Sequence, residues 1–386
     1  MKTKMGIGYT FSGMLTLAML LSGIGMVLPF FSEELGLSVG QAGLIVSMQY
    51  IGYTVAVLIG GILADRYGKI LILKISMFFF AGATVMLAAA QSYGAVLAAV
   101  CALGMFGGVL QNDVTAIALD CEREKQDKNN NIIQVAFSIG AVVTPLLFLL
   151  FTVWLDAGYR WVYVILAAFC AVMFGVSLFY KDRTSGVKSK QGVMDDLKGF
   201  VREKYWWVAC IGMFLYVSAE VTVWGFVPEM TARMGGSFVV SALSTIAIWG
   251  AMAVGRALCV WLISKMDMVP IMLIGGVLSA ISVAGIALLQ GGAVVVAAAL
   301  AGFFFAPFYP MMVNWMKRLT GAKSNIAIAM VMASGSFGIV VTGWVTGQVG
   351  QLAERHGFSY SWMMAVSVGC MVGLVALLLV FGKKRK

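Results

Sequence analysis

Twelve apolar runs, each about as long as the hydrocarbon core of a bilayer is thick, limit what this chain can fold into. A helix needs roughly 20 apolar residues to cross that core, and backbone groups in lipid must be satisfied internally, which rules out an open strand edge. A β-barrel would show alternating segments of about 10 residues, whereas these runs are continuous. We therefore predict an all-α integral membrane protein with 12 transmembrane helices. The runs are 9–31, 38–63, 71–91, 93–119, 129–153, 159–180, 206–229, 238–263, 270–290, 293–316, 324–350 and 360–382.

The composition agrees with a membrane protein and excludes several other classes. The chain is 61% hydrophobic and 11% charged, whereas soluble domains are roughly half apolar and a quarter charged. The first run is too long for a signal-peptide core and no small-residue cleavage site follows it, so we expect it to stay in the mature protein. The six cysteines have no paired spacing and the single histidine, His356, falls in a loop. We therefore expect no metal and no cofactor.

The net charge of +10 is explained by its distribution along the chain. When loops are numbered from a cytoplasmic N-terminus, all of the 27 Lys and Arg fall on the inner side except Arg160, Arg233 and Arg355. The positive-inside rule then predicts an inner (plasma) membrane protein with both termini in the cytoplasm. The closing Lys383–Lys386 is expected to contact the anionic leaflet. No nucleic-acid partner is needed to explain the charge.

One polar, basic segment divides the runs into six and six. We predict an N-terminal six-helix bundle over 1–180, a cytoplasmic linker over 181–205 and a C-terminal six-helix bundle over 206–386. The halves are distantly alike, since "GGILADRYGK" (Gly60–Lys69) ends the second run and "GRALCVWLISKMD" (Gly255–Asp267) ends the eighth. Two such halves are the layout of carriers that rock around a central site.

The string "GGILADRYGK" is the most specific motif. A glycine lets a helix approach its neighbour closely, an Asp-Arg pair at the inner end of a helix can form an ion pair or a cap, and Gly68 permits a turn. The alternative is that Asp65 and Arg66 are ordinary loop charges. The motif resembles the signature loop of the major facilitator superfamily. Its matching residues are Gly61, Asp65, Arg66, Gly68 and Lys69, whereas Ile70 stands where a second basic residue is usual.

That resemblance implies functions for positions in both halves. In the superfamily the signature loop helps to hold the outward-open state, so its residues are expected to gate conformational change. Helices 1, 4, 7 and 10 line the central cavity in that fold. The resemblance thus places the fourth and seventh runs, which carry Asp113 and Glu220, on the cavity.

Two acids, Asp113 and Glu220, lie within runs, whereas the other 15 of the 17 acidic residues fall in loops or at helix ends. A charge at the bilayer centre costs at least about 2.5–3.5 kcal/mol, so such residues normally face a cavity or a partner. Desolvation favours the protonated carboxyl group, and an acid in a poorly hydrated cavity can therefore exchange a proton near neutral pH. We expect proton coupling through Glu220, Asp113 or both. The alternative is an acid that stays protonated and only bonds its neighbours.

Amide and aromatic side chains inside the runs have the character of a sugar site, where rings stack on C–H faces and amides bond hydroxyls. For any single aromatic residue, packing or the interfacial belt is the alternative role. An unpaired amide in hydrocarbon is costly and is therefore more informative. The candidate substrate-binding residues are Gln49, Tyr53, Gln111, Asn112, Gln134, Tyr216, Glu220, Trp224, Trp249, Tyr309 and Asn314.

A narrower resemblance is to the fucose–galactose–proton symporter family. It is carried by "LPFFSEELGLSVGQAGLIVSMQYIGY", "NIIQVAFSIGA" and "YVSAEVTVWGF" followed by "GRALCVWLISKM". By position, Gln134 matches a cavity glutamine. Arg256 belongs to the family's Gly-Arg pair in helix 8, and we expect it to act in conformational gating with the residues of the signature loop. The family's helix 1 acid is Gly25 here, and its helix 4 acid falls on Gln111, two residues before Asp113. Two residues turn a helix by about 200°, so the proton pathway does not transfer, and uniport or sodium coupling stays open.

Three functions compete. The first is import of a sugar or similar polar solute by a monomeric secondary transporter, with a proton or sodium as co-substrate. The second is export of drugs or metabolites on the same fold, since an exporter of cations would also use acids in an aromatic cavity. The third, a membrane enzyme or primary pump, is disfavoured because the chain has no Gly-x-x-x-x-Gly-Lys-Ser/Thr phosphate loop. Amides in the runs favour the importer.

Overall fold

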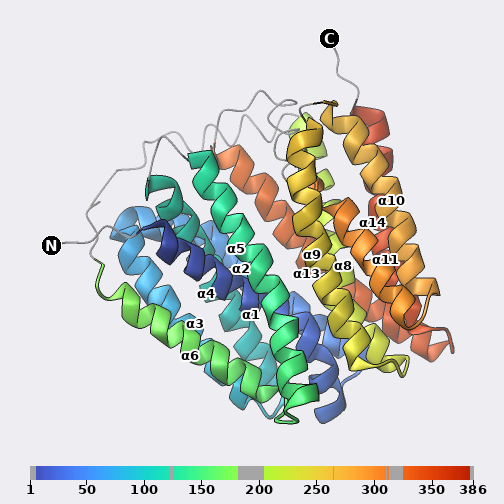
Figure 1. Ribbon diagram of the computed structural model, residues 1–386, viewed down its shortest axis with the longest axis horizontal. Coiled ribbons are helices and arrows are strands. Elements are labelled where there is room, and N and C mark those ends of the chain that lie inside the picture. The colour runs from blue at the N-terminus through green and yellow to red at the C-terminus, as the bar shows by residue number, and fades with distance from the viewer. Residues whose placement is uncertain are drawn as a thin grey trace. The chain divides into compact units, whose positions relative to one another are not determined.

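The computed structural model describes residues 6–121, 126–180, 204–263, 265–309, 311–312 and 325–382. All regular structure in these ranges is helical, which confirms the predicted class (Figure 1). A π-helical turn at Leu150–Trp154 follows α5, and a 3-10 turn at Tyr360–Met363 precedes α14. The α-helices are α1 (Ile7–Glu34), α2 (Val39–Tyr67), α3 (Lys69–Ala89), α4 (Tyr93–Cys121), α5 (Gln126–Leu149), α6 (Arg160–Ser177), α8 (Lys204–Arg233), α9 (Phe238–Ile263), α10 (Met268–Leu288), α11 (Gly292–Phe305), α13 (Asn325–Arg355) and α14 (Met364–Phe381).

Each predicted run coincides with one of these helices, and ten helices of the described chain are long and apolar enough to cross a membrane. One difference in a boundary bears on function. The motif at 60–69 was expected to end a helix and form a loop, but α2 continues to Tyr67 and α3 begins at Lys69. Only Gly68, with a φ of 98°, separates them. Asp65 and Arg66 therefore belong to the last turn of α2, because no residue before Gly68 breaks the helix.

Contacts divide the chain into two compact units. The first consists of Met1–Leu37 with Ile45–Ser189, and the second of Ser38–Leu44 with Lys190–Lys386. Of the expected linker 181–205, all but the last two residues lie outside the described ranges. The candidate spans α1 and α8 are the most enclosed, with 83% and 78% of their most apolar windows buried and 50% or less in every other span. Each unit is thus built around its first helix.

The same close crossing of two helices occurs in both units. In the first unit, a Cβ added to Gly104 of α4 would lie 1.7 Å from the backbone oxygen of Gln49 in α2. In the second unit, a Cβ on Gly302 of α11 would lie 2.2 Å from the oxygen of Ile248 in α9. Each residue of the second pair follows its counterpart by about 200 positions. Only glycine allows backbones to approach so closely, so both crossings depend on it.

A second crossing repeats in the same way. A Cβ on Gly140 of α5 would lie 2.5 Å from the oxygen of Leu15 in α1, and one on Gly338 of α13 would lie 2.8 Å from the oxygen of Phe214 in α8. The local sequences "SIGAVVT" (Ser138–Thr144) and "SFGIVVT" (Ser336–Thr342) agree at five of seven positions. The internal repeat, which the two loop strings indicate only weakly, is therefore carried by the helix crossings.

We predict that Gly104→Ala lowers the stability of the protein by at least about 1–3 kcal/mol, because the methyl group forces α2 and α4 apart. The matched control is Gly94→Ala, where an added Cβ would meet nothing within 4 Å. Alanine is the better helix former, so the control should be neutral or stabilised by up to about 1 kcal/mol. Thermal unfolding of both variants in detergent makes the comparison, and equal melting temperatures would show that the crossing is not tight.

Candidate functional site

The buried acid of α8 sits in a cluster built from three segments of the second unit. Glu220 lies near the middle of α8 and is only 8% exposed. Arg256 of α9 acts electrostatically on its carboxyl group, and Tyr216, one turn earlier on α8, has its hydroxyl near the same group without forming a regular hydrogen bond to it. Tyr309, which follows α11, also belongs to this charged group of side chains. The sequence predicted all four as functional residues but did not predict that they meet.

Aromatic rings border the cluster on both sides along α8. The Tyr216 ring stacks on Phe308, with centroids 5.4 Å apart and planes inclined by 18°. On the other side of Glu220, Trp224 lies 6.0 Å from Trp249 of α9. The predicted stripe of Tyr216, Glu220 and Trp224 at four-residue spacing is therefore a continuous face of α8 that packs towards α9 and α11. An acid, an arginine and rings in one place can bond a polar solute and stack on its apolar faces.

Polar residues of the first unit form a different arrangement, in which they tie helices together. The Nε2 of Gln49 donates to the backbone oxygen of Leu21 at 3.1 Å, and the Nδ2 of Asn112 donates to that of Val57 at 2.8 Å. The hydroxyl of Tyr53 donates to Oε1 of Gln111 at 2.6 Å. These bonds join α2 to α1 and to α4. Substrate contact by these four side chains stays a prediction, and the role visible here is to brace helices.

The remaining candidates lie on helices other than those of the Glu220 cluster or outside the described residues. Asp113 of α4 has no exposed surface, and Gln134 of α5 is half-buried. Asn314 lies outside the described residues. At the motif, Arg66 is exposed and stacks its guanidinium over the ring of Tyr67, and Lys69 is half-buried. Gly61 and Asp65 are helical in α2, but their side chains are outside the described part.

A third acid, Glu229, is also buried, although by its sequence position it counts among the acids at helix ends. α8 continues to Arg233, and Glu229 has no exposed surface. The Nε of Arg233 lies 2.7 Å from its Oε1, and the guanidinium also covers the ring of Tyr360, whose hydroxyl donates to Glu354. The missed signal was the Glu-Arg spacing of four, which forms an ion pair along a helix.

The first unit has a matching network. Arg160 lies 2.6 Å from Glu34 and covers the ring of Tyr159, whose hydroxyl also donates to Glu34. Tyr159 and Tyr360 each begin a Tyr-x-Trp sequence at the start of a helix, "YRW" in the first unit and "YSW" in the second. Two of the three arginines that depart from the inner-side charge bias are therefore paired with carboxylates.

Most of the chain matches the sequence profile of one protein family. The profile of the Major Facilitator Superfamily matches residues 10–293. The chain belongs to the major facilitator superfamily. It is therefore a multi-span membrane transporter and not an enzyme, because the members of this superfamily are transporters. The narrower kinship with fucose–galactose–proton symporters is not confirmed by this match.

Two curated relatives match part of the chain, and both are named as resistance proteins. The quinolone resistance protein NorA of Staphylococcus aureus (strain N315) is 28% identical over 127 residues, and the multidrug resistance protein MdtG of Yersinia enterocolitica is 30% identical over 158 residues. These matches cover 32% and 40% of this chain, and 33% and 38% of the two relatives, so the chain matches only about a third of the length of these curated proteins.

Solved structures resemble the whole chain at low identity. A point mutant of the nucleoside transporter NupG has a TM-score of 0.81 at 15% identity, with 97% of this chain and 98% of that one covered. A point mutant of the Escherichia coli fucose:proton symporter FucP has a TM-score of 0.66 at 17% identity, with 98% of each chain covered. At such identities these likenesses establish the fold alone.

We predict that Glu220 and Arg256 are energetically coupled. Arg256→Gln alone leaves the buried Glu220 without its counter-charge, and Glu220→Gln alone leaves the half-buried Arg256 without one, which is costly. The double variant leaves neither charge. The double variant should therefore lose less stability than the two single losses combined, with an interaction energy of about 0.5–3 kcal/mol. Thermal or denaturant unfolding in detergent measures this. The matched control changes the exposed residues Glu33 and Lys204 to glutamine in the same design, and their effects on stability should add. If the stability losses of Glu220→Gln and Arg256→Gln also add, these two residues do not interact.

Proposed function

We propose that this chain is a secondary transporter that moves a small polar solute, a sugar or sugar derivative, across the membrane by alternating access. The observation that carries the proposal is that Arg256 acts electrostatically on the buried carboxyl group of Glu220, in a cluster with Tyr216, Tyr309 and Trp224. An isolated acid would attract a lipophilic cation. An ionised acid and an arginine together have no net charge, and the two side chains present hydrogen-bond acceptors and donors respectively. Such a pair suits a neutral solute with many hydroxyl groups, and the rings suit its C–H faces.

The proposed architecture follows the prediction made from the sequence. We infer that all 12 helices span the membrane as two six-helix bundles, 1–180 and 206–386, joined by a linker in the cytoplasm. The repeated glycine crossings support this division because they relate α1, α2, α4 and α5 to α8, α9, α11 and α13. The distribution of Lys and Arg supports an inner-membrane location with both termini in the cytoplasm. In this architecture the last turn of α2 and Gly68 would act in gating.

Glu220 is also the proposed proton-coupling group, with Asp113 as the second candidate. Protonation of Glu220 would release Arg256 from its counter-charge, and deprotonation would restore the pair. A switch of this kind gives the cluster two electrostatic states, which is what coupling of a proton to a conformational cycle requires. A neighbour named a fucose:proton symporter has the same fold, which is compatible with such coupling.

The second candidate function is efflux of drugs or metabolites. It is favoured by a specific observation, namely that both curated relatives are named as resistance proteins. The two functions differ in what binds the purified protein. Sugars raise the apparent melting temperature of an importer by binding only its folded state, whereas lipophilic cations would do so for the exporter. A shift with cations and none with a sugar panel would favour efflux.

We predict that Glu220→Gln abolishes concentrative uptake but keeps exchange. In proteoliposomes, the parent with one proton per solute should accumulate labelled substrate up to about tenfold under a gradient of one pH unit, since one unit is worth about 1.4 kcal/mol. The variant should only equilibrate the substrate, while counterflow without a gradient persists. Glu33→Gln, an exposed acid, is the matched control and should behave as the parent. Tenfold accumulation by both Glu220→Gln and Asp113→Asn would exclude the coupling role, and absence of counterflow with every sugar tested would exclude the substrate class.

A further inference from the structure

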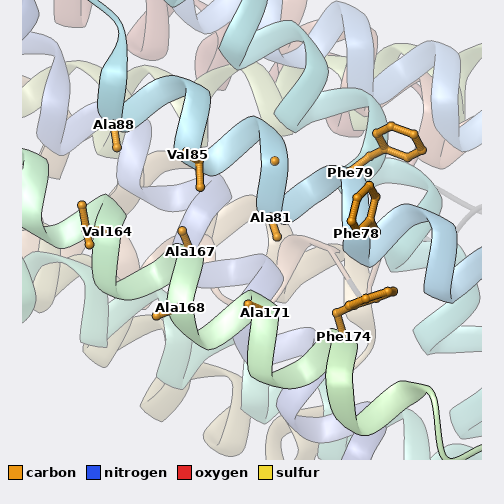
Figure 2. A pocket seen from close by; sticks show the side chains of 11 residues that line it. Phe78, Phe79, Ala81, Val85, Ala88, Val164, Ala167, Ala168, Ala171 and Phe174 are labelled. Carbon is orange, nitrogen blue, oxygen red and sulfur yellow. The ribbon is translucent and has the colours of Figure 1, made fainter.

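A groove between α3 and α6, in the first unit, has no part in the proposed transport site. Its volume is about 530 Å³, and every residue that lines it belongs to one of these two helices. Figure 2 shows the order along it, with Ala88 and Val164 at one end and Phe78, Phe79 and Phe174 at the other. The side chains of Phe78, Val85 and Val164 are 45–55% exposed. The groove therefore opens away from the core of the unit.

The floor of the groove is made of small residues. Ala81 of α3 lies across from Ala167 and Ala171 of α6 in Figure 2, and Gly82 of α3 lines the same groove. A Cβ added to Gly82 would meet nothing within 4 Å, in contrast to Gly104 and Gly140, which permit close helix crossings in the same unit. Glycine inside a helix costs about 1 kcal/mol relative to alanine. No internal contact of the described chain accounts for glycine at position 82, whose effect is to deepen the groove.

The chemistry of the walls restricts what can occupy the groove. All lining residues are Phe, Ala, Gly or Val, so the groove offers no polar side chain. At one end the rings of Phe78 and Phe174 lie 5.4 Å apart, which bounds the space. An occupant without polar groups along its length, such as a hydrocarbon chain, fits these walls without leaving a hydrogen bond unmade.

A cation stands next to the aromatic end. Lys74 is one turn before Phe78, so the two side chains share a face of α3. Its Nζ donates one hydrogen bond, 2.7 Å long, to the backbone oxygen of Tyr180. An ammonium group has three N–H donors, and Lys74 is half-buried rather than enclosed. Lysine stems lie along apolar surface while the charge reaches the membrane interface, which places a phosphate-binding group where a lipid headgroup would be.

We propose that the groove between α3 and α6 is a lipid-binding site, which holds one acyl chain of an anionic phospholipid while Lys74 binds its phosphate group. In the orientation proposed above, α3 begins at the cytoplasmic leaflet, where anionic lipids attract basic residues. A second copy of this chain is a poorer occupant. In a symmetric dimer of two chains with the same membrane orientation, its own Lys74 would lie at the same depth and would bring no negative charge.

Native mass spectrometry of the full chain in detergent, titrated with phosphatidylglycerol or phosphatidylcholine, tests the proposal. Gly82→Leu fills the groove and should remove the tightest-bound lipid of either kind. Lys74→Gln keeps the groove and should reduce the preference for phosphatidylglycerol about fivefold, the change expected for one basic residue at an anionic surface. The controls are Gly369→Leu, where an added Cβ also meets open space on an exposed face of α14, and Lys204→Gln, an exposed lysine at the start of α8. Both controls should bind lipid as the parent does.

Two outcomes would overturn the proposal. One is Gly82→Leu binding phosphatidylglycerol as tightly as the parent, with an unchanged melting temperature that shows it is folded. The other is a loss of dimer in Gly82→Leu with unchanged lipid binding, which would assign the groove to contact between copies. Lys74→Gln tests the phosphate contact separately, because it leaves the apolar surface of the groove intact. An unchanged preference for phosphatidylglycerol in this variant would show that Lys74 does not bind the phosphate group.

Discussion

A carboxyl group inside an apolar helix bundle has to be compensated, and the functional part of this structure depends on how that is done for Glu220. Removing one member of a buried ion pair costs about 3–5 kcal/mol, because the other is left uncompensated. Here Arg256 supplies the opposite charge and Tyr216 lies beside the carboxyl group. In the proposed function, a solute or proton that engages one of the two charged groups changes the electrostatic environment of the other.

Glycine crossings hold α9, the helix that carries Arg256, tightly against α11. A Cβ on Gly255 would lie 2.7 Å from the backbone oxygen of Phe303, so α9 packs against α11 directly beside Arg256. Gly302 provides the neighbouring close approach between the same helices. Because the hydrophobic effect does not drive helices together in lipid, small residues that allow close packing determine where helices meet. The repeat of these crossings in the first unit indicates that both halves use one packing solution.

Helix positions could be predicted from the sequence because apolar runs of bilayer length are unambiguous, but contacts between helices could not. Glu220 and Arg256 are separated by a turn and most of two helices, and nothing in their spacing shows that they meet. Gln49 and Asn112 each bond a backbone oxygen of a neighbouring helix, and their contact with a solute stays a prediction. An amide in an apolar run indicates that a partner exists without showing whether the partner is a solute or the protein. Glu229 was missed because it falls at the predicted end of its run, while the helix continues another turn to Arg233.

In the proposed transporter, Glu220 and its neighbours face a pathway that water and solute can enter. Labelling of Glu220→Cys with a water-soluble thiol reagent, in a background without the six native cysteines, tests this most directly. Val372→Cys, on an exposed face of α14, provides the comparison for a position facing lipid. We expect Glu220→Cys to react readily, a bound sugar to slow the reaction, and Val372→Cys to stay unreactive. A thiol at position 220 as unreactive as the one at 372 would contradict it.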